Sequence, residues 1–254
     1  MSRDRRFEGK VALVTGAGRG MGKATALTLA RDGATVAVND LNAENAGKAV
    51  DEIIAAGGRA KAWVCDVSDE AAVQAMAKEI VEEFGTIHIL VNNAGILRAT
   101  RPLENISAEE WRLMMRVNLD SVFYCTKAVI PYMREQRYGR IVNVSSSAGR
   151  STSTFGGAHY TTVKTAVLGL SRHTAREYGQ YNITVNATAP GSMDTEMVRE
   201  MATPEHMASE AAANLLGRLG TSQDEADLVA FLASDEASYI TGATVDLNGG
   251  DLMI

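Results

Sequence analysis

The chain has 254 residues, of which 46% are hydrophobic and only 4 are prolines, a composition that allows a sizeable core and excludes extensive disorder. Its net charge of −6, without a long run of one sign, gives no support to nucleic-acid binding. No apolar segment is long enough to span a membrane or to serve as an export signal, and the two cysteines form no CxxC pair, so we expect a cytoplasmic protein without a membrane partner.

Short apolar runs alternate along the chain with longer amphipathic ones. Seven runs predict strands, several of them apolar nearly throughout, as strands buried on both faces are: Lys10–Thr15, Thr35–Asn39, Ala60–Cys65, Ile87–Asn92, Arg140–Ser145, Ile183–Thr188 and Ala243–Asn248. The segments between them predict helices at Gly20–Arg31, Ala43–Ala56, Asp69–Phe84, Ala108–Arg134, Ala158–Tyr178 and Ser222–Ala233. This order predicts one α/β domain over residues 1–254, a doubly wound, Rossmann-like parallel sheet of seven strands with helices on both faces.

A glycine-rich loop follows the first predicted strand and reads VTGAGRGMGKAT over residues 14–25. It fails the P-loop pattern, because Ala24 stands where a hydroxyl should bind Mg²⁺, and it fails GxGxxG in either frame. It does join a strand to a helix, where backbone N–H groups favour an anion. We therefore expect the loop to hold a phosphate, although a merely tight turn is the simpler alternative.

Asp40 ends the second predicted strand, 24 residues after Gly16. A carboxylate at that place can accept hydrogen bonds from an adenosine ribose, and it would repel a 2′-phosphate, so Asp40 favours NAD over NADP. Arg19 in the glycine loop argues for NADP, since a guanidinium binds phosphate well, unless it is a solvated surface charge. Asp40 has an alternative role as the cap of the helix that starts near Asn42.

Tyr160 and Lys164 are spaced i, i+4 on a predicted helix, which places both side chains on one face. Ser145, Ser146 and Ser147 end the fifth predicted strand, at the edge of the sheet where ligands bind. Taken alone, a Tyr–Lys pair of this spacing is a common surface pattern, and its meaning depends on the motifs around it.

With those motifs the chain resembles the short-chain dehydrogenase/reductase family. The loop is similar to the family's TGxxxGxG turn (Thr15, Gly16, Gly20 and Gly22), and YxxxK is formed by Tyr160 and Lys164. The other matches, in chain order, are Asp66–Val67 in CDVSD, NNAG at Asn92–Gly95, Asn118 in RVNLD, Ser146 in NVSSSAG, Pro190–Gly191, Thr195 and NGG at Asn248–Gly250. The resemblance therefore covers nearly the whole chain.

The resemblance implies an NAD-dependent oxidoreductase that acts on secondary alcohols or ketones. It implies that Tyr160 is the general acid/base, that Lys164 lowers the pKa of Tyr160 and holds the nicotinamide ribose, that Ser146 binds the substrate oxygen, and that Asn118 orders the proton path. The implied cofactor-binding residues are Gly16, Arg19, Gly20, Met21, Gly22, Asp40, Asp66, Val67, Asn92, Ala94, Gly95, Tyr160, Lys164, Pro190, Gly191, Met193 and Thr195. Gly18 is interpreted as incidental to the turn. The family also suggests a homotetramer.

Several of these assignments have alternatives. Asn92 could only tie neighbouring strands together, and Thr195 could cap the next helix. Ser146 precedes Tyr160 by 14 residues, one more than the family's common spacing, which Ser147 would restore; we prefer Ser146 because of its place in NVSSxxG. His88 stands where the family more often has Asp.

A tyrosine base needs help from its surroundings. Its unperturbed pKa is ~10, so lowering it to ~7 requires about 4 kcal/mol of preference for the anion. A lysine cation one helical turn away and the positive nicotinamide ring can supply that preference. The four histidines show no metal-ligand spacing, and we expect no metal site.

Residues 192–218 fit no β–α unit and are predicted to be a helical substrate lid. Met193, Met197 and Met201 recur at i+4 and predict an adaptable apolar stripe, which favours a small or medium ketone or secondary alcohol. An NADP-dependent 3-oxoacyl-carrier-protein-type reductase is the alternative, disfavoured because NAGILRATRPLENIS does not follow the NAGITRD form associated with that branch. A non-catalytic dinucleotide-binding module is the alternative of another class.

Overall fold

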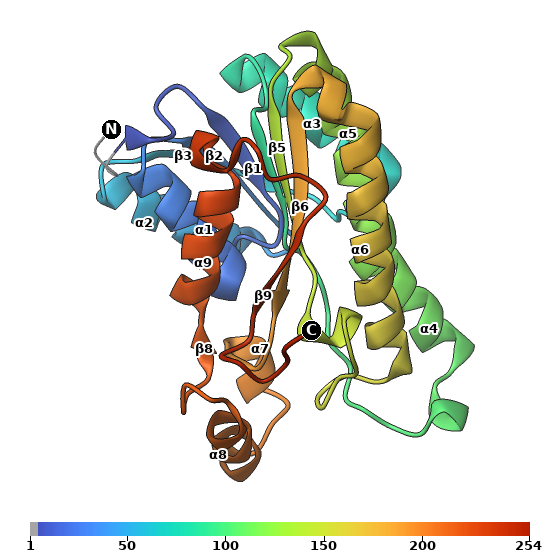
Figure 1. Ribbon diagram of the computed structural model, residues 1–254. Coiled ribbons are helices and arrows are strands. Elements are labelled where there is room, and N and C mark those ends of the chain that lie inside the picture. The colour runs from blue at the N-terminus through green and yellow to red at the C-terminus, as the bar shows by residue number, and fades with distance from the viewer. Residues whose placement is uncertain (1–4) are drawn as a thin grey trace.

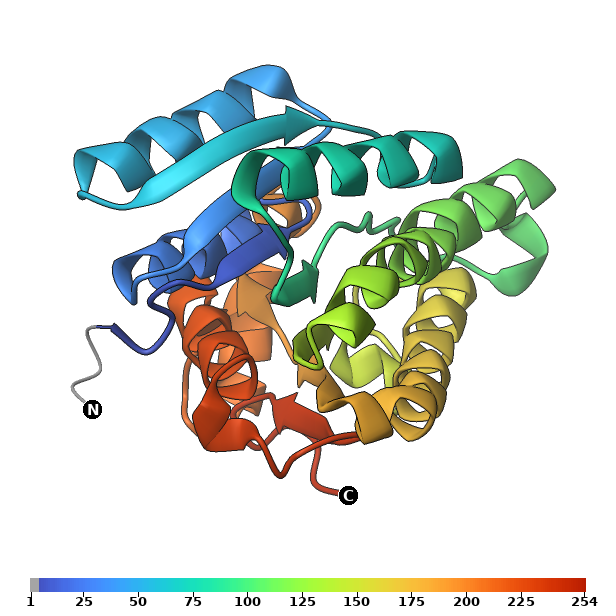
Figure 2. The ribbon, with the colours of Figure 1, turned by 90° about the horizontal axis from the view of Figure 1, so that it is seen from above.

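A parallel sheet lies between two layers of helices in the computed structural model of the chain, which describes residues 5–254 (Figures 1 and 2). The seven strands have the order β3-β2-β1-β4-β5-β6-β9, and every neighbouring pair is parallel. The strands are β1 (Val11–Val14), β2 (Thr35–Asp40), β3 (Arg59–Val64), β4 (Ile89–Asn92), β5 (Gly139–Val144), β6 (Ile183–Pro190) and β9 (Thr244–Leu247). The predicted fold class is confirmed.

The helices are α1 (Gly20–Arg31), α2 (Ala43–Ala55), α3 (Glu70–Phe84), α4 (Ala108–Met115), α5 (Ser121–Glu135), α6 (Ala158–Tyr178), α7 (Glu196–Arg199), α8 (Pro204–Ala213) and α9 (Ser222–Leu232). A separate two-stranded sheet pairs β7 (Met193–Asp194) with β8 (Gly220–Thr221). None of the helices within residues 5–254 is both long enough and apolar enough to cross a bilayer.

The core has two parts, one on each face of the sheet. Ala12 and Val14 of β1 pack in a cluster with α1, α2 and α9, whereas Val11 and Leu13 pack on the other face with α3, α5 and α6. This division follows from the alternation of side chains along a strand. Because helices cover both faces, β1, β4, β5 and β6 are buried at every position, which explains the nearly continuous apolar sequences of β1 and β4.

The predicted helix at 108–134 is interrupted in the structure. Helices α4 and α5 are joined by a π-helical turn, Arg116–Asp120, that contains the buried Asn118. The Asn118 amide donates to the carbonyl of Met114 (3.2 Å), so this side chain competes for a backbone acceptor of its own helix. Such π turns often occur at functional sites.

The segment at 192–218, which we expected to be helical, is helical only in α7 and α8. Met193 lies in β7, Met197 lies in α7, and Met201 follows α7 at the surface, so the predicted methionine stripe on one helix is wrong. Two separate helices start in this segment, each with a threonine N-cap. The hydroxyl of Thr195 accepts a hydrogen bond from Val198 N (3.4 Å) at the start of α7, and that of Thr203 accepts one from His206 N (3.2 Å) at the start of α8. Pro204 then occupies the start of α8, where a missing N–H is tolerated.

Candidate active site

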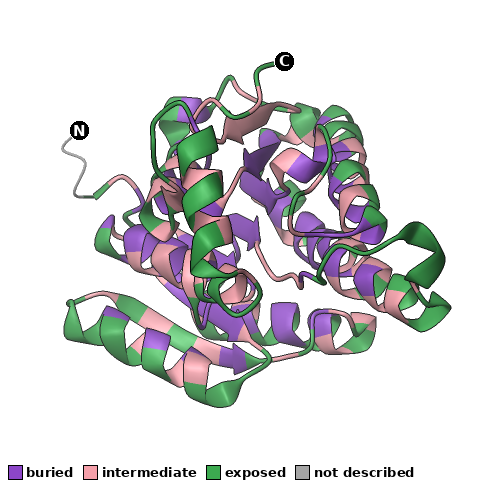
Figure 3. Ribbon diagram, turned by 90° about the horizontal axis from the view of Figure 1, so that it is seen from below, coloured by how far each residue is buried: buried purple, intermediate pink, exposed green. Residues whose placement is uncertain are grey.

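A cavity of about 850 Å³ opens at the carboxyl ends of β1, β2, β3 and β4, the edge of the sheet seen from below in Figure 3. In a doubly wound sheet this edge is where ligands bind. Predicted cofactor residues that line the cavity are Gly16, Arg19, Gly20, Met21, Asp40, Asp66, Val67, Ala94, Gly95 and Thr195. The cavity therefore gathers residues from five separate segments of the chain.

All four glycines of the loop meet a local requirement. Gly16 and Gly20 have φ of 60° and 56°, in the left-handed region that favours glycine. A Cβ on Gly22 would lie 2.2 Å from the carbonyl oxygen of Gly16, so α1 packs directly on the loop. The expectation that Gly18 is incidental is wrong, because a Cβ there would lie 2.6 Å from Cβ of Asn45.

Asp40 connects the glycine loop to the end of β2. One carboxylate oxygen accepts from Gly18 N (2.9 Å) and the other from Asn42 N (2.9 Å), while the side chain of Asn42 caps α2. A carboxylate has about four lone-pair positions, so these two bonds leave acceptor capacity toward the cavity. The alternative role of Asp40 as the cap of α2 is thus filled by Asn42.

Arg19 extends from the loop toward the segment after α7. Its guanidinium pairs with the carboxylate of Glu200 at 2.8 Å, and both side chains are about half exposed. Arg19 is therefore neither an isolated solvated charge nor a free phosphate ligand in this structure.

Asn92 does not line the cavity, contrary to its predicted cofactor contact. Its buried amide donates to Asn143 Oδ1 (2.8 Å) and Thr126 Oγ1 (3.2 Å), which ties β4 to β5 and α5. The next residue, Asn93, lines the cavity and donates to the carbonyls of Thr15 (2.9 Å) and Gly16 (3.1 Å). The signal was present in NNAG, because adjacent residues at a strand end point to opposite sides.

Three other predicted contacts lie beside the cavity without lining it. Pro190 ends β6, and a Cβ on Gly191 would lie 2.8 Å from Cβ of Asn248, so this turn packs on the NGG segment. Met193 is buried and approaches Gly220 of the partner strand β8. Thr195, by contrast, both lines the cavity and caps α7, so its two alternative roles coexist.

The four predicted catalytic residues do not line the cavity but lie near one another behind its wall at Gly95. Ser146 follows β5, Tyr160 lies in the first turn of α6, and Lys164 follows one turn later. The Lys164 ammonium donates to Val144 O (2.9 Å) and lies 5.7 Å from the centre of the Tyr160 ring.

Gly95 connects the cavity to these residues. A Cβ on Gly95 would lie 2.7 Å from Asn118 Oδ1 and 3.8 Å from the Lys164 ammonium, so the cavity wall directly adjoins both. Asn118 Oδ1 in turn accepts from Ile96 N (3.0 Å), which fixes the loop after β4 against the π-helical turn. The structure thus brings all four residues to one place, while their roles stay predictions.

Burial raises the pKa of Tyr160, and a hydrogen bond with the Ser146 hydroxyl opposes that shift. This direction is opposite to the lowered pKa that we expected. The physical reason is that the ammonium is directed at the Val144 carbonyl rather than at the phenol. Lys164 itself is buried, which lowers its pKa to about 8.

The geometry also distinguishes the two candidate serines. Ser146 faces the Tyr160 phenol and accepts from Ala148 N (3.1 Å), whereas Ser147 begins one turn of 3-10 helix. The loop before Tyr160 includes Gly156, where a Cβ would lie 2.8 Å from the Tyr160 ring. Ser146 is therefore the serine placed for contact with Tyr160.

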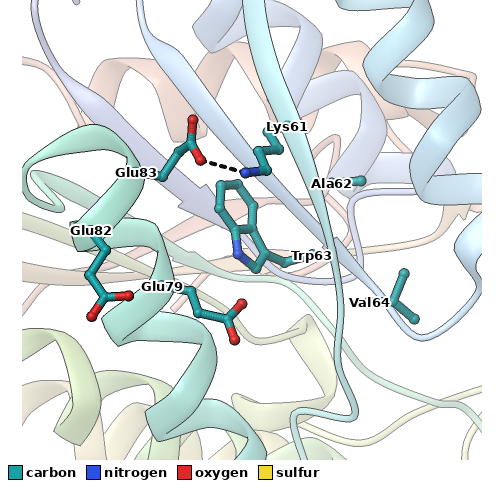
Figure 4. A pocket seen from close by; sticks show the side chains of 7 residues that line it. All are labelled: Lys61, Ala62, Trp63, Val64, Glu79, Glu82 and Glu83. Atoms are coloured by element: carbon teal, nitrogen blue, oxygen red, sulfur yellow. Dashed lines mark hydrogen bonds and ion pairs between the residues drawn. The ribbon is translucent and has the colours of Figure 1, made fainter.

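A second hollow, of about 480 Å³, lies between the edge strand β3 and α3 (Figure 4). Lys61 pairs there with Glu83 beside Trp63, and Glu79 and Glu82 complete an acidic rim. It contains none of the predicted site residues. Within residues 5–254, no cluster of three or more His, Cys, Asp or Glu side chains is placed to hold a metal ion.

Known proteins are similar to this chain in both sequence and fold. A family model described as Enoyl-(Acyl carrier protein) reductase matches residues 16–251. The 3-oxoacyl-[acyl-carrier-protein] reductase FabG of Escherichia coli is 43% identical over 248 residues, which are 98% of this chain and 99% of that protein. The (2S)-[(R)-hydroxy(phenyl)methyl]succinyl-CoA dehydrogenase subunit BbsD of Thauera aromatica is 40% identical over 244 residues, 96% of this chain and 97% of that one.

A solved structure extends the comparison to three dimensions. The crystal structure of a 3-oxoacyl-[acyl-carrier protein] reductase with bound NAD from Brucella melitensis superposes with a TM-score of 0.91 at 37% identity, covering 99% of this chain and 95% of that chain. The resemblance seen in the motifs is thereby confirmed. The chain belongs to the short-chain dehydrogenase/reductase family and is an oxidoreductase.

Proposed function

We propose that the protein transfers hydride between a nicotinamide dinucleotide and an acyl thioester that carries a ketone or a secondary alcohol. The convergence of Asn118, Ser146, Tyr160 and Lys164 next to the cavity wall at Gly95 carries this proposal. The substrate class is supported by the names of the relatives, which describe a reductase of a carrier-bound 3-oxoacyl group and a dehydrogenase of a hydroxylated acyl-CoA. This assignment replaces our first expectation of a simple ketone or alcohol.

The residues present fit a dinucleotide. Gly16 and Gly22 leave a cradle that a Cβ would fill, and the N-terminus of α1 points its N–H groups at that cradle. When bound, the nicotinamide ring donates or accepts the hydride. Tyr160 then has to move only the proton, Ser146 orients the reacting oxygen, and the charge of Lys164 favours the tyrosinate.

We further propose NAD(H) as the cofactor, with NADP(H) as the alternative. Support comes from the Asp40 carboxylate at the cavity wall, from the engagement of Arg19 by Glu200, and from the NAD named in the Brucella structure. Asp40→Ala is expected to lower the ratio of kcat/KM for NAD(H) over NADP(H) at least about tenfold, because the carboxylate attracts ribose hydroxyls and repels a 2′-phosphate.

The ratio is the quantity to measure, because Asp40 also holds Gly18 and its loss can weaken both cofactors together. Asp51→Ala serves as the matched control, since Asp51 is an exposed carboxylate on α2. A ratio that stays at the wild-type value in Asp40→Ala would assign the preference to another residue.

A substrate panel tests the proposed reaction. We expect 3-oxoacyl-CoA and 3-oxoacyl-carrier-protein thioesters to be reduced with higher kcat/KM than simple ketones, each assayed with NADH and NADPH. Higher efficiency with simple ketones would restore the broader activity. Dinucleotide binding without turnover on the whole panel would favour the non-catalytic binding module.

We also propose that residues 192–218 act as the substrate lid and that the chain forms a homotetramer. The lid is supported by Glu196 and Met197, which line the cavity, and by the pairing of Arg19 with Glu200 across its mouth. The tetramer rests on family resemblance, and light scattering of the purified protein tests it.

A further inference from the structure

Glu225 is a buried acid that the reaction proposed above leaves without a role. It lies in the first turn of α9 and its exposed fraction is 0%. One carboxylate oxygen accepts from the Thr188 hydroxyl at 2.6 Å, whereas the other has no hydrogen-bond partner among the described residues. A buried carboxylate is strongly destabilising unless another group compensates its charge.

The surroundings of Glu225 lead to Lys164. Thr188 of β6 is the register partner of Val144 of β5, and the Val144 carbonyl accepts from the Lys164 ammonium at 2.9 Å. Neighbouring strands are about 4.8 Å apart, so the groups that bind the two charges, Thr188 and the Val144 carbonyl, are one strand spacing apart. The two charges approach the sheet from opposite faces, since α9 and α6 belong to different helix layers (Figure 1).

Among the described residues, neither the Glu225 carboxylate nor the Lys164 ammonium has another oppositely charged partner. Within residues 5–254, Glu225 and Lys164 form no direct ion pair. Two of the strands beside α9, β6 and β8, carry no charged residue. Each of the other charged side chains on α9 and on the segments packed against it already has a polar partner. These pairs are Lys23 with Glu52, Arg31 with Asp32, Asp224 with Arg218, Asp227 with Gln223, Arg140 with Asp235, and Glu236 with Arg6. The charged residues on the helical segments packed against α6 are all at least partly exposed: Glu109, Glu110, Arg112, Arg116, Asp120, Lys127, Arg134 and Glu135.

We propose that Glu225 is the buried counter-charge of Lys164 and, when ionised, holds the ammonium in its protonated form. Glu225 is thus a positioning residue, which acts on the reaction only through Lys164. Its effect on turnover rests on the proposed function, in which the Lys164 cation assists Tyr160. The pairing of the two charges does not depend on that function.

The titration of each group supports the proposal. Burial raises the pKa of Glu225 to about 7, and the Thr188 hydrogen bond and the Lys164 charge both oppose this shift. Burial lowers the pKa of Lys164 to about 8, and the charge of Glu225 opposes that shift. Below pH 7 Glu225 is mostly neutral, so its influence on Lys164 grows as the pH rises through 7.

Glu225→Gln removes the charge but keeps the shape and an acceptor for Thr188. We expect wild-type kcat/KM near pH 6 and a loss of about threefold or more near pH 9, because without the counter-charge Lys164 releases its proton at lower pH. Asp227→Asn is the matched control, since Asp227 is an exposed acid on the same helix. Superimposable pH profiles of Glu225→Gln and wild type would overturn the proposal.

A second measurement needs neither substrate nor turnover. The infrared band of the buried protonated carboxyl, identified by its loss in Glu225→Gln, reports the titration of Glu225 in the wild-type protein. In Lys164→Met this titration is expected to move to higher pH by about one unit, because coupling between two sites is reciprocal. Thr188→Val should move it in the same direction, since the hydroxyl stabilises the anion.

The outcomes separate the two proposals. A Glu225 titration that is the same in Lys164→Met and wild type shows that the charges are not coupled and rejects the counter-charge. A shifted titration in a protein that turns over no substrate on the panel retains the counter-charge and rejects the proposed function. If Glu225→Gln does not fold, the band is identified instead by its shift in Thr188→Val, which removes the hydroxyl that is bonded to the Glu225 carboxylate, so the test remains valid.

Discussion

Tyr160→Phe is expected to lower kcat about 10³-fold in both the oxidative and the reductive direction. The substitution removes only the phenolic oxygen, which is the proton donor or acceptor opposite Ser146 in the proposed reaction. Because Tyr160 does not line the cavity of about 850 Å³, dinucleotide affinity should change little. Initial rates in both directions, together with cofactor fluorescence titration, measure the two effects separately.

Tyr239→Phe provides the control for this variant, because Tyr239 is fully exposed and contacts none of the site residues. Thermal unfolding of both variants shows whether Tyr160→Phe remains folded. Near wild-type turnover by Tyr160→Phe in both directions would mean that another group carries the proton.

Gly22→Ala is expected to have the largest effect on the glycine loop. The new Cβ would lie 2.2 Å from Gly16 O and 2.4 Å from the Asn93 amide, and the first of these is backbone that a rotamer change cannot move. Overpacking of this kind costs about 1–3 kcal/mol of unfolding free energy, and the displaced loop should bind dinucleotide at least about tenfold more weakly. Thermal melting and equilibrium binding of NAD(H) measure the two losses.

Gly47→Ala is the matched control for Gly22→Ala. Gly47 lies inside α2, and a Cβ there meets no atom within 4 Å. The same substitution should therefore stabilise the protein by about 0.5–1 kcal/mol through helix propensity and leave dinucleotide binding unchanged. Equal melting temperatures for the two alanine variants would contradict the packing argument.

The sheet could be predicted because both of its faces are covered. Strands β1 and β4, which are buried at every position, are apolar nearly throughout, and such runs are visible without an alignment. β6 is also buried at all eight positions, although polar and apolar residues alternate along it, so its pattern alone does not reveal that both faces are covered. Helix ends were also predictable: Gly20–Arg31 and Ala158–Tyr178 have the expected bounds. These features depend on local sequence and on burial of a whole segment.

Features that depend on one side chain and its distant partner could not be predicted. The π-helical turn at Asn118 is hidden in an ordinary helical pattern, because it depends on that amide reaching Met114 O and Ile96 N. The role of Gly18 depends on Asn45, which belongs to a helix beyond the next strand. The raised pKa of Tyr160 follows from burial and from the direction of the Lys164 ammonium, neither of which spacing reveals.

In the proposed binding mode, the hydrogen bond from Gly18 N to Asp40 couples the choice of cofactor to the binding of phosphate. The carboxylate proposed to contact the ribose would also set the path of the loop proposed to contact the pyrophosphate. An engineer who exchanges Asp40 alone to admit NADP(H) would therefore relax the loop as well as remove the charge. A successful exchange would need a second change that restores the tether, most directly at Asn45, which already lies against Gly18.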